Sequence, residues 1–169
     1  MNKILNKNFY KQDTLKVAEN LIGKYLVKDD EAHMIIETEA YNGPHDKASH
    51  AHKGRTDRTE VMFGSAGLWY VYLVYGMYWM LNIVTSSKDY PAAVLIRGVK
   101  KFKGPGILTR ELGVTDKFNN KPADESTGLW IEDREKEIEE GNIKRTPRIG
   151  VDYAKEWKNK PYRFVLKKD

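Results

Sequence analysis

The apolar positions near the start of the chain recur at helical spacing. Those that would share one face of a helix are Leu15, Ala18, Leu21 and Ile22. Residues three and four apart lie on the same side of a helix, so this pattern predicts a helix over 15–22. Asp13 or Thr14 can cap its start, and Gly23 would end it. A second helix is predicted over 104–113, again ended by a glycine.

Short apolar runs between polar turns fill most of the remaining chain, and such runs are typical of strands. The predicted strands cover 24–27, 33–41, 69–75, 78–84, 92–99 and 129–133, with one near 144–151 and one at 162–166. The first two are joined by the polar turn DDEA, and the two over 69–84 form a hairpin that turns around Gly76 and Met77. These elements predict an α+β fold: a single compact domain over 1–169, with a curved, mainly antiparallel β-sheet flanked by helices.

The composition is that of a globular protein, because 40% of the residues are hydrophobic and 31% are charged. The most apolar stretch, 68–84, is interrupted by Gly76 and rich in tyrosine, so it fits two strands better than a membrane span. The chain has no cysteine, which excludes disulfides and cysteine-ligated metals. Its first residues lack the apolar core of a signal peptide, so secretion is not expected.

The segment 42–58 is polar and rich in histidine, glycine and basic residues. We therefore expect a loop, with a helical turn at DKASH over 46–50. Asp57 could cap a short helix that follows this loop, because Glu60 lies three residues further on and completes a capping-box pattern.

Three histidines occur close to Asp46 in this loop: His45, His50 and His52. Their spacing matches no strong metal-binding motif, so we expect no metal and instead one histidine that faces a pocket. Basic residues follow at Lys47, Lys53, Arg55 and Arg58, and the chain has a net charge of +5. A basic strip suits contacts with the phosphates of a nucleic acid. A solvated loop without a ligand is the alternative for the lysines.

Two acids interrupt the apolar strand over 33–41. Strict alternation would place Ile35, Glu37, Glu39 and Tyr41 on one face, with Met34, Ile36, Thr38 and Ala40 on the other. Carboxylates are seldom buried without a partner, and Arg97 in the strand over 92–99 could supply one. The acids and the arginine form either a structural ion pair or a general base that the arginine orients.

The hairpin over 69–84 is rich in aromatic residues. Its first strand would alternate, with Tyr70 and Tyr72 on one face and Trp69, Val71, Leu73 and Tyr75 on the other. Plain sheet core is one explanation, since aromatic residues form strands well. Flat aromatic faces also stack on nucleobases. Tyr75 stands beside Gly76 at the tip, where a projecting ring could wedge between base pairs.

The chain has no Walker loop, GxGxxG fingerprint, GxSxG elbow or HExxH motif, so nucleotide hydrolysis, Rossmann redox chemistry and common hydrolase schemes lose support. Three long segments in order resemble the alkyladenine (3-methyladenine) DNA glycosylase family: IIETEAYNGPHDKASHA, MFGSAGLWYVYLVYGMYWMLNIV and AAVLIRG. The resemblance runs from about residue 10 to the C-terminus, through GPGILTRELG and EWKNKPYRF.

This resemblance implies roles for the acid strand and its arginine. Glu39 matches the catalytic base, which activates a water for attack on C1′ of a deoxyribose. Arg97 matches the arginine that helps to hold this water, and Glu37 is expected to be structural. A backbone carbonyl within 148–151 is expected to contact the same water.

The resemblance also implies a pocket for a nucleotide that is flipped out of the duplex. Tyr41 would stack on one face of the base, with His50 and Tyr72 on the other, and the loop around His50 would bond to the base edge. Tyr75 would fill the gap left in the DNA. Asn82 would disfavour the exocyclic amino group of normal guanine.

The implied partner is double-stranded DNA, with its backbone held by Lys53, Arg55 and Arg58. Tyr70 falls at a further pocket-side position. His45 is an additional titratable group, expected near the pocket mouth, that could shift substrate preference. We expect a monomeric cytoplasmic protein, associated with the nucleoid if bacterial or archaeal.

The implied activity is that of a monofunctional glycosylase for 3-methyladenine, 7-methylguanine, hypoxanthine or ethenoadenine. No lysine aligns with the site to form a Schiff base, so the product would be an abasic site, and no cofactor or metal is expected. Two alternatives stay open: a protein that binds damaged or distorted DNA without catalysis, and a hydrolase of free nucleosides.

Overall fold

The computed structural model describes residues 2–168. Its centre is a curled antiparallel sheet with the strand order β1-β7-β2-β3-β6-β5-β4, in which β9 also pairs with β3 and β8 pairs with β9. The strands are β1 (Lys3–Ile4), β2 (Tyr25–Lys28), β3 (Glu31–Asn42), β4 (Trp69–Val74), β5 (Tyr78–Val84), β6 (Ala92–Val99), β7 (Leu129–Asp133), β8 (Ile143–Thr146) and β9 (Arg163–Leu166). The α-helices are α1 (Lys7–Tyr10), α2 (Thr14–Asn20) and α3 (Pro105–Leu112). The short 3-10 helices are η1 (His50–Lys53), η2 (Glu60–Phe63), η3 (Asp116–Phe118), η4 (Glu125–Thr127), η5 (Glu140–Asn142) and η6 (Asp152–Asn159). The predicted α+β fold with one compact domain and an antiparallel sheet is confirmed.

Several elements form where the sequence places them. α2 begins after Asp13, whose carboxylate accepts a 3.1 Å hydrogen bond from the backbone N–H of Lys16. α3 ends at Gly113, which has a φ of 64° that glycine adopts without strain. β6 has the predicted bounds, and Arg97 is its only residue that is not buried.

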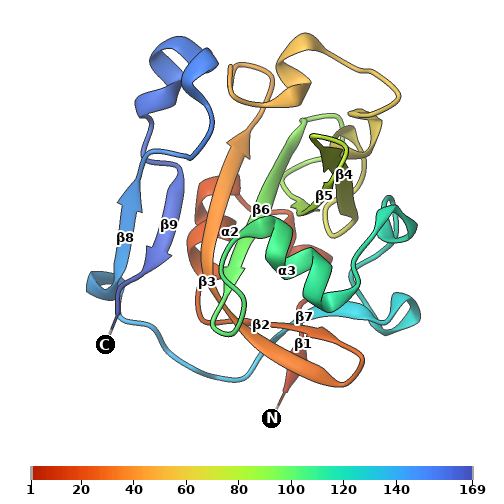
Figure 1. Ribbon diagram of the computed structural model, residues 1–169, viewed down its shortest axis with the longest axis vertical. Coiled ribbons are helices and arrows are strands. Elements are labelled where there is room, and N and C mark those ends of the chain that lie inside the picture. The colour runs from red at the N-terminus through yellow and green to blue at the C-terminus, as the bar shows by residue number, and fades with distance from the viewer. Residues whose placement is uncertain (1, 169) are drawn as a thin grey trace.

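The long strand β3 runs through the middle of the molecule, with the β8–β9 pair on one side and β6 on the other (Figure 1). Its first residues pair with β2, and its later residues pair with β6 along one edge and with β9 along the other. Glu37 and Glu39 therefore lie on a segment with a hydrogen-bonded strand on both sides. A strand in this central position keeps its side chains from bulk water more than an edge strand does.

Two irregularities break the alternation that the sequence predicts for β3. Ile35 pairs with Val99 and Glu37 with Gly98, which leaves Ile36 as an extra residue on β3. Thr38 then pairs with Ile96, which leaves Arg97 as an extra residue on β6. β-bulges of this kind change the direction of the side chains that follow.

The prediction that Ile35 shares a face with the two acids is therefore wrong. Ile35 and Ala40 both belong to the main hydrophobic core, and the hydroxyl of Thr38 donates a 2.8 Å hydrogen bond to the carbonyl of Ala18 in α2. Beyond the bulge, Glu39 faces away from this core. The bulge lets an apolar strand change into an acid-bearing one without burying both acids in the core.

The hairpin of β4 and β5 has the predicted faces. Trp69 and Val71 lie in the main core, while the rings of Tyr70 and Tyr72 lie together with their centroids 5.2 Å apart. At the turn, Tyr75 and Gly76 have φ values of 52° and 63°. A left-handed conformation at both positions is that of a tight hairpin turn, and it directs the Tyr75 side chain outward.

The helical turn expected at DKASH is present: the Ser49 N–H donates a 3.0 Å hydrogen bond to the carbonyl of Asp46, and η1 begins at His50 with Ser49 as its cap. The expected role of Asp57 is wrong. Asp57 does not cap η2. Thr56 and Thr59 shape this turn instead, because each hydroxyl accepts a hydrogen bond from the backbone N–H of the other, at 2.9 and 3.2 Å.

The main hydrophobic core lies between the sheet and the helices. Its most deeply buried members include Leu21 at the C-cap of α2, Leu108 of α3, and Ile35, Leu81, Ile96 and Leu129 of the sheet. Within residues 2–168, no helix has both the length and the apolar character that crossing a membrane requires. The packed sheet holds in place the strand ends and loops that line the cleft described below.

Candidate active site

A cleft of about 890 Å³ lies between the end of β3, the β4–β5 hairpin, the start of α3 and the segment before η6. It brings together residues that the sequence singles out from distant parts of the chain: Tyr41, His50, Arg58, Tyr70, Tyr72, Tyr75, Asn82 and Arg97 all line it. The volume is large enough for a nucleobase with its sugar. Ile149, which belongs to the segment 148–151 expected near the water, also lines the cleft, as does Tyr153, which the sequence does not single out.

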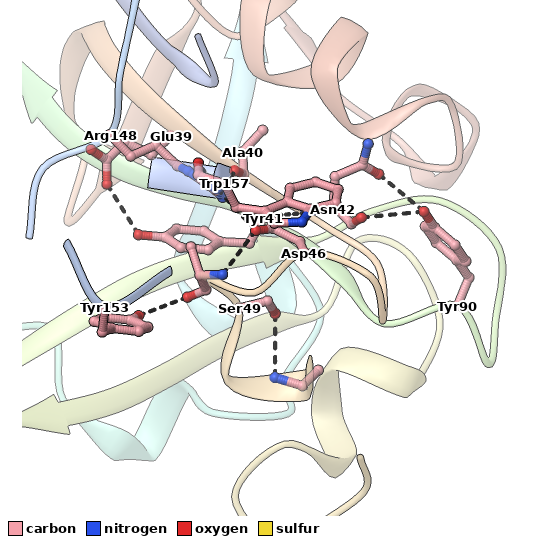
Figure 2. A network of polar contacts seen from close by, with 12 residues as sticks. Glu39, Ala40, Tyr41, Asn42, Asp46, Ser49, Tyr90, Arg148, Tyr153 and Trp157 are labelled. Carbon is pink, nitrogen blue, oxygen red and sulfur yellow. Dashed lines mark hydrogen bonds and ion pairs between the residues drawn. The ribbon is translucent and has the colours of Figure 1, made fainter. Parts of the chain in front are cut away.

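Glu39 lies beneath this cleft, with its side chain fully buried. Its Oε2 accepts a 2.8 Å hydrogen bond from the backbone N–H of Ile149. Its Oε1 accepts longer hydrogen bonds from the hydroxyl of Tyr41 at 3.2 Å and from Nη1 of Arg97 at 3.4 Å. Figure 2 shows the Tyr41 contact within the surrounding polar network.

The protonation of Glu39 is set by opposing effects. Burial raises the pKa of this carboxyl above its usual value, while Arg97, the Ile149 N–H, the Tyr41 hydroxyl and Arg148 each lower it. The net direction is upward. A carboxylate with a raised pKa is a stronger proton acceptor, which is the property that a general base requires.

Arg97 links the two acids of β3. Its Nε lies 3.0 Å from Oε1 of Glu37, closer than its Nη1 lies to Glu39. Glu37 also pairs with Arg163 of β9 at 3.0 Å. Glu37 thus receives two arginines and fixes the orientation of Arg97, while Glu39 keeps only a long contact with it.

The walls of the cleft are aromatic. The ring of His50 stands edge-on to Tyr72 with centroids 4.7 Å apart, and the guanidinium of Arg58 lies 4.8 Å from the centre of the Tyr72 ring. Burial, with a smaller contribution from Arg58, lowers the pKa of His50 to about 4, so this imidazole is neutral at physiological pH. Burial raises the pKa of Tyr70 to about 12.

Asn82 is buried among the residues that line the cleft. Its Nδ2 donates hydrogen bonds to the backbone carbonyls of Tyr70 at 3.1 Å and Met80 at 3.3 Å. These two contacts fix the amide plane between the strands of the hairpin. Tyr75, at the tip of the same hairpin, is 91% exposed.

A second, basic groove of about 600 Å³ adjoins the cleft and shares Ser49, His50, Arg58 and Tyr153 with it. The basic side chains that line this groove are Lys47, His52, Lys53, Arg58 and Lys155. Arg55 does not line it. The guanidinium of Arg55 is paired with Glu60 at 2.9 Å and with Asp89 at 2.6 Å.

The histidines of the loop lie in different settings. His50 lines the cleft and His52 the groove, where Nδ1 of His52 contacts the carbonyl of Pro44 at 2.8 Å. His45, expected near the pocket mouth, is exposed and lines neither hollow. Across residues 2–168, no three histidine or acidic side chains are grouped so that they could hold a metal ion.

The structure also places residues at the site that the sequence did not reveal. Arg148 and Asp46 form a fully buried ion pair behind Tyr41, and the hydroxyl of Tyr153 donates a 2.8 Å hydrogen bond to the carbonyl of Ala48. Figure 2 shows Arg148 and Tyr153 beside the loop that follows β3 and carries Asp46. The partners are about a hundred positions apart, so no local pattern indicates them.

Comparison with known proteins identifies the class of protein. The sequence profile for methylpurine-DNA glycosylase (MPG) matches residues 8–104 and 100–169, which is nearly the whole chain. Such proteins are monofunctional DNA glycosylases that act on alkylated bases, and this protein is one of them. The chain belongs to the methylpurine-DNA glycosylase family.

Several bacterial relatives carry the name "Putative 3-methyladenine DNA glycosylase". One from Legionella pneumophila (strain Corby) is 43% identical over 174 residues, covering 96% of this chain and 94% of the relative. One from Sodalis glossinidius is 46% identical over 157 residues, covering 89% and 91%. One from Wolbachia sp. subsp. Brugia malayi (strain TRS) is 44% identical over 172 residues, covering 98% of both chains.

Proposed function

We propose that the protein flips alkylated or deaminated purines out of duplex DNA and hydrolyses the N-glycosidic bond with a water that Glu39 activates. The substrates are 3-methyladenine, 7-methylguanine, hypoxanthine and ethenoadenine, and the product is an abasic site. The single observation that carries this proposal is the buried carboxylate of Glu39 beneath an aromatic cleft, with a raised pKa and only two long side-chain contacts.

The reaction needs one proton acceptor. As the bond between C1′ and the base nitrogen breaks, its electrons leave with the base and positive charge develops on the sugar, which an anionic carboxylate stabilises. The water adds its oxygen to C1′ and gives a proton to Glu39. A base that is already cationic, such as 7-methylguanine, needs no added proton to leave.

A water must first reach Glu39. In the free protein its Oε1 is covered by Tyr41 and Arg97, but those contacts are 3.2 and 3.4 Å long. Catalytic contacts are often loose before the substrate binds. We propose that a water enters between these donors and that Arg97, oriented by Glu37, then holds it, with a backbone carbonyl of 148–151 as a further contact.

The walls of the cleft suit the flipped base. Tyr41 would stack on one face and the His50–Tyr72 pair on the other, with Tyr70 beside them. A neutral His50 avoids repulsion with a cationic methylated purine, which the electron-rich aromatic faces attract. The fixed amide of Asn82 would exclude the exocyclic amino group of normal guanine.

The surroundings of the cleft suit duplex DNA. Tyr75 would insert into the stack and occupy the space that the flipped nucleotide leaves. The basic groove next to the cleft would hold the phosphates with Lys53, Arg58 and Lys155, while Lys47, paired with Glu156 at 2.6 Å, would contribute less. Arg55, whose charge two acids already balance, would contribute less than its neighbours.

A panel of end-labelled duplexes tests this proposal. Each duplex carries one hypoxanthine, ethenoadenine or 7-methylguanine, and after incubation without metal the abasic sites are cleaved with alkali. Strand breaks that need both enzyme and alkali are expected, and their rates rank the substrates. Tight binding of damaged duplexes without any base release would instead favour a protein that recognises damaged DNA and lacks catalysis. Activity on free nucleosides but not on duplexes would favour a hydrolase of free nucleosides.

A further inference from the structure

Two fully buried charges lie behind the base cleft. Nη1 of Arg148 is 2.6 Å from Oδ2 of Asp46, and Nη2 of Arg148 is 2.9 Å from Oδ1 of the same carboxylate. Both side chains are 0% exposed. The pairing is bidentate, which is the strongest and most directional arrangement that an arginine and a carboxylate can form.

The pair joins three segments of the chain. Arg148 donates to the carbonyl of Ala40 at 2.8 Å, on the residue that follows Glu39, and to the carbonyl of Trp157 at 3.3 Å. Asp46 accepts hydrogen bonds from the backbone N–H groups of Asn42 at 2.9 Å and Ala48 at 3.0 Å. The end of β3, the loop that leads to η1, and the segment from Arg148 into η6 are therefore fixed to one another.

Each of these segments carries a part of the proposed site. β3 carries Glu39 and Tyr41, the loop leads to His50, and the residue after Arg148 is Ile149, whose N–H contacts the Glu39 carboxylate. The Arg148 guanidinium also lies 5.0 Å from the centre of the Tyr41 ring. A shift of Arg148 would therefore move both the Tyr41 ring and the Ile149 N–H that contacts Glu39.

A buried ion pair is a costly way to connect three segments. Removing two charges from water carries a large desolvation cost, and well-packed apolar side chains of the same volume often stabilise a protein equally well. What an apolar replacement would not supply is a fixed direction for the attached backbone groups. The stability of the fold therefore does not by itself account for this pair.

We propose that Arg148 and Asp46 are positioning residues of the glycosylase reaction, and that their bidentate contact holds the Ile149 N–H on Glu39 and sets the spacing of the Tyr41 and His50 walls. This role rests on the proposed function. The charge of Arg148 acts in the same place, because it is one of the groups that lower the pKa of Glu39 against the effect of burial.

Two substitutions separate geometry from charge. Arg148→Lys keeps the positive charge and removes the two-pronged pairing, so we expect a loss of about 10²-fold in the single-turnover rate of base release, with duplex binding changed by less than about threefold. Arg148→Gln removes the charge as well. Its loss raises the pKa of Glu39, so we expect the acid limb of the pH–rate profile of Arg148→Gln to lie at a higher pH than that of the wild type. Arg148→Lys should keep the acid limb of the wild type.

A matched control comes from Arg145→Gln in β8, which removes an exposed ion pair with Glu19, away from the cleft. Thermal unfolding of each variant gives the folded fraction at the assay temperature. If Arg148→Lys loses rate only in proportion to its unfolded fraction, or if Arg148→Gln keeps the wild-type acid limb, the pair is structural and the proposal is overturned. If the wild type itself releases no base, the proposed function fails as well. If the wild type is active and the variants behave as described above, only the positioning role fails.

Discussion

The backbone N–H of Ile149 donates a 2.8 Å hydrogen bond to Oε2 of Glu39, across 110 positions of sequence. This contact is the shortest that the carboxylate makes, and it comes from a backbone group that cannot move without moving its whole segment. It holds one oxygen of Glu39 in place, while the other oxygen faces the longer contacts with Tyr41 and Arg97. The Ile149 N–H thus fixes Oε2 of the carboxylate. At Oε1, a water could replace the longer contacts with Tyr41 and Arg97.

The raised pKa of Glu39 predicts the pH dependence of base release. A general base must be deprotonated, so the rate should fall as the pH falls through the folded-state pKa, which lies above the usual value of 4.5. The measurement is the single-turnover rate on duplexes with 7-methylguanine, a cationic base that needs no added proton to leave. An acid limb at or below pH 4.5 would contradict the assignment of Glu39.

The same shift has a consequence for stability. Because the folded-state pKa of Glu39 is raised, the folded protein binds its proton more tightly than the unfolded chain does. The contribution of this group to stability is therefore greatest below pH 4.5 and is lost as the pH rises through the folded-state pKa. At neutral pH the ionised Glu39 lowers the stability of the fold, as is common for catalytic groups.

His50 should remain neutral through the physiological range. Its pKa of about 4 lies below the usual value of 6.5, because burial and Arg58 disfavour the imidazolium. The stability from the neutral ring is fully present above pH 6.5 and is lost as the pH falls through about 4. An NMR titration of the His50 ring checks this. A His50 midpoint near the usual value of 6.5 would refute the prediction.

Tyr75 should matter for duplex DNA and not for the fold. Its side chain is 91% exposed, so Tyr75→Ala should change the free energy of unfolding by less than about 0.5 kcal/mol. Without a ring to fill the space in the stack, we expect base release from duplex DNA to fall by at least about tenfold. Unchanged single-turnover rates in Tyr75→Ala on duplex substrates would show that flipping does not depend on this residue.

The lining of the basic groove predicts which basic side chains bind the DNA phosphates. Lys155 lines it and has a φ of 52° and a ψ of −128°, a strained conformation for a residue with a side chain. Lys155→Gly should therefore raise the midpoint of thermal unfolding. It should also make the negative slope of log K against log salt less steep by about 0.9 for each phosphate that the variant no longer neutralises. A weaker binding constant in a more stable variant cannot come from unfolding.

Arg55→Ala is the matched control for this prediction. Its guanidinium lies between Glu60 and Asp89, outside the groove, and we expect a smaller change in the salt slope. Equal changes in Lys155→Gly and Arg55→Ala would mean that the groove has no special part in holding the DNA.

The sequence predicts the elements of this fold better than their register. The bounds of β6 and the end of α3 at Gly113 follow from local patterns, because a buried run and a terminal glycine carry their own signals. The bulges at Ile36 and Arg97 do not, since they depend on how β3 and β6 pair. For the same reason, the capping role expected of Asp57 is wrong: local chemistry allowed it, but the Thr56–Thr59 pair satisfies the turn.

The candidate site shows a similar division. Residues with recognisable sequence motifs, such as Tyr41, Tyr72 and Arg97, do come together around one cleft. Arg148 and Asp46 carry no such signal, because an ion pair across 102 positions exists only once the chain has folded. Lys155 likewise joins the basic groove from a segment far from the loop that holds Lys53.

The role of Glu39 as general base is tested most directly by the single-turnover rate of base release by Glu39→Gln on a hypoxanthine duplex, measured beside its affinity for the same duplex. The amide keeps the size of the side chain and cannot accept a proton from water. We predict a loss of at least about 10²-fold in rate, with binding close to that of the wild type and a midpoint of thermal unfolding that is no lower. A Glu39→Gln protein that releases hypoxanthine at the wild-type rate would show that Glu39 is not the general base.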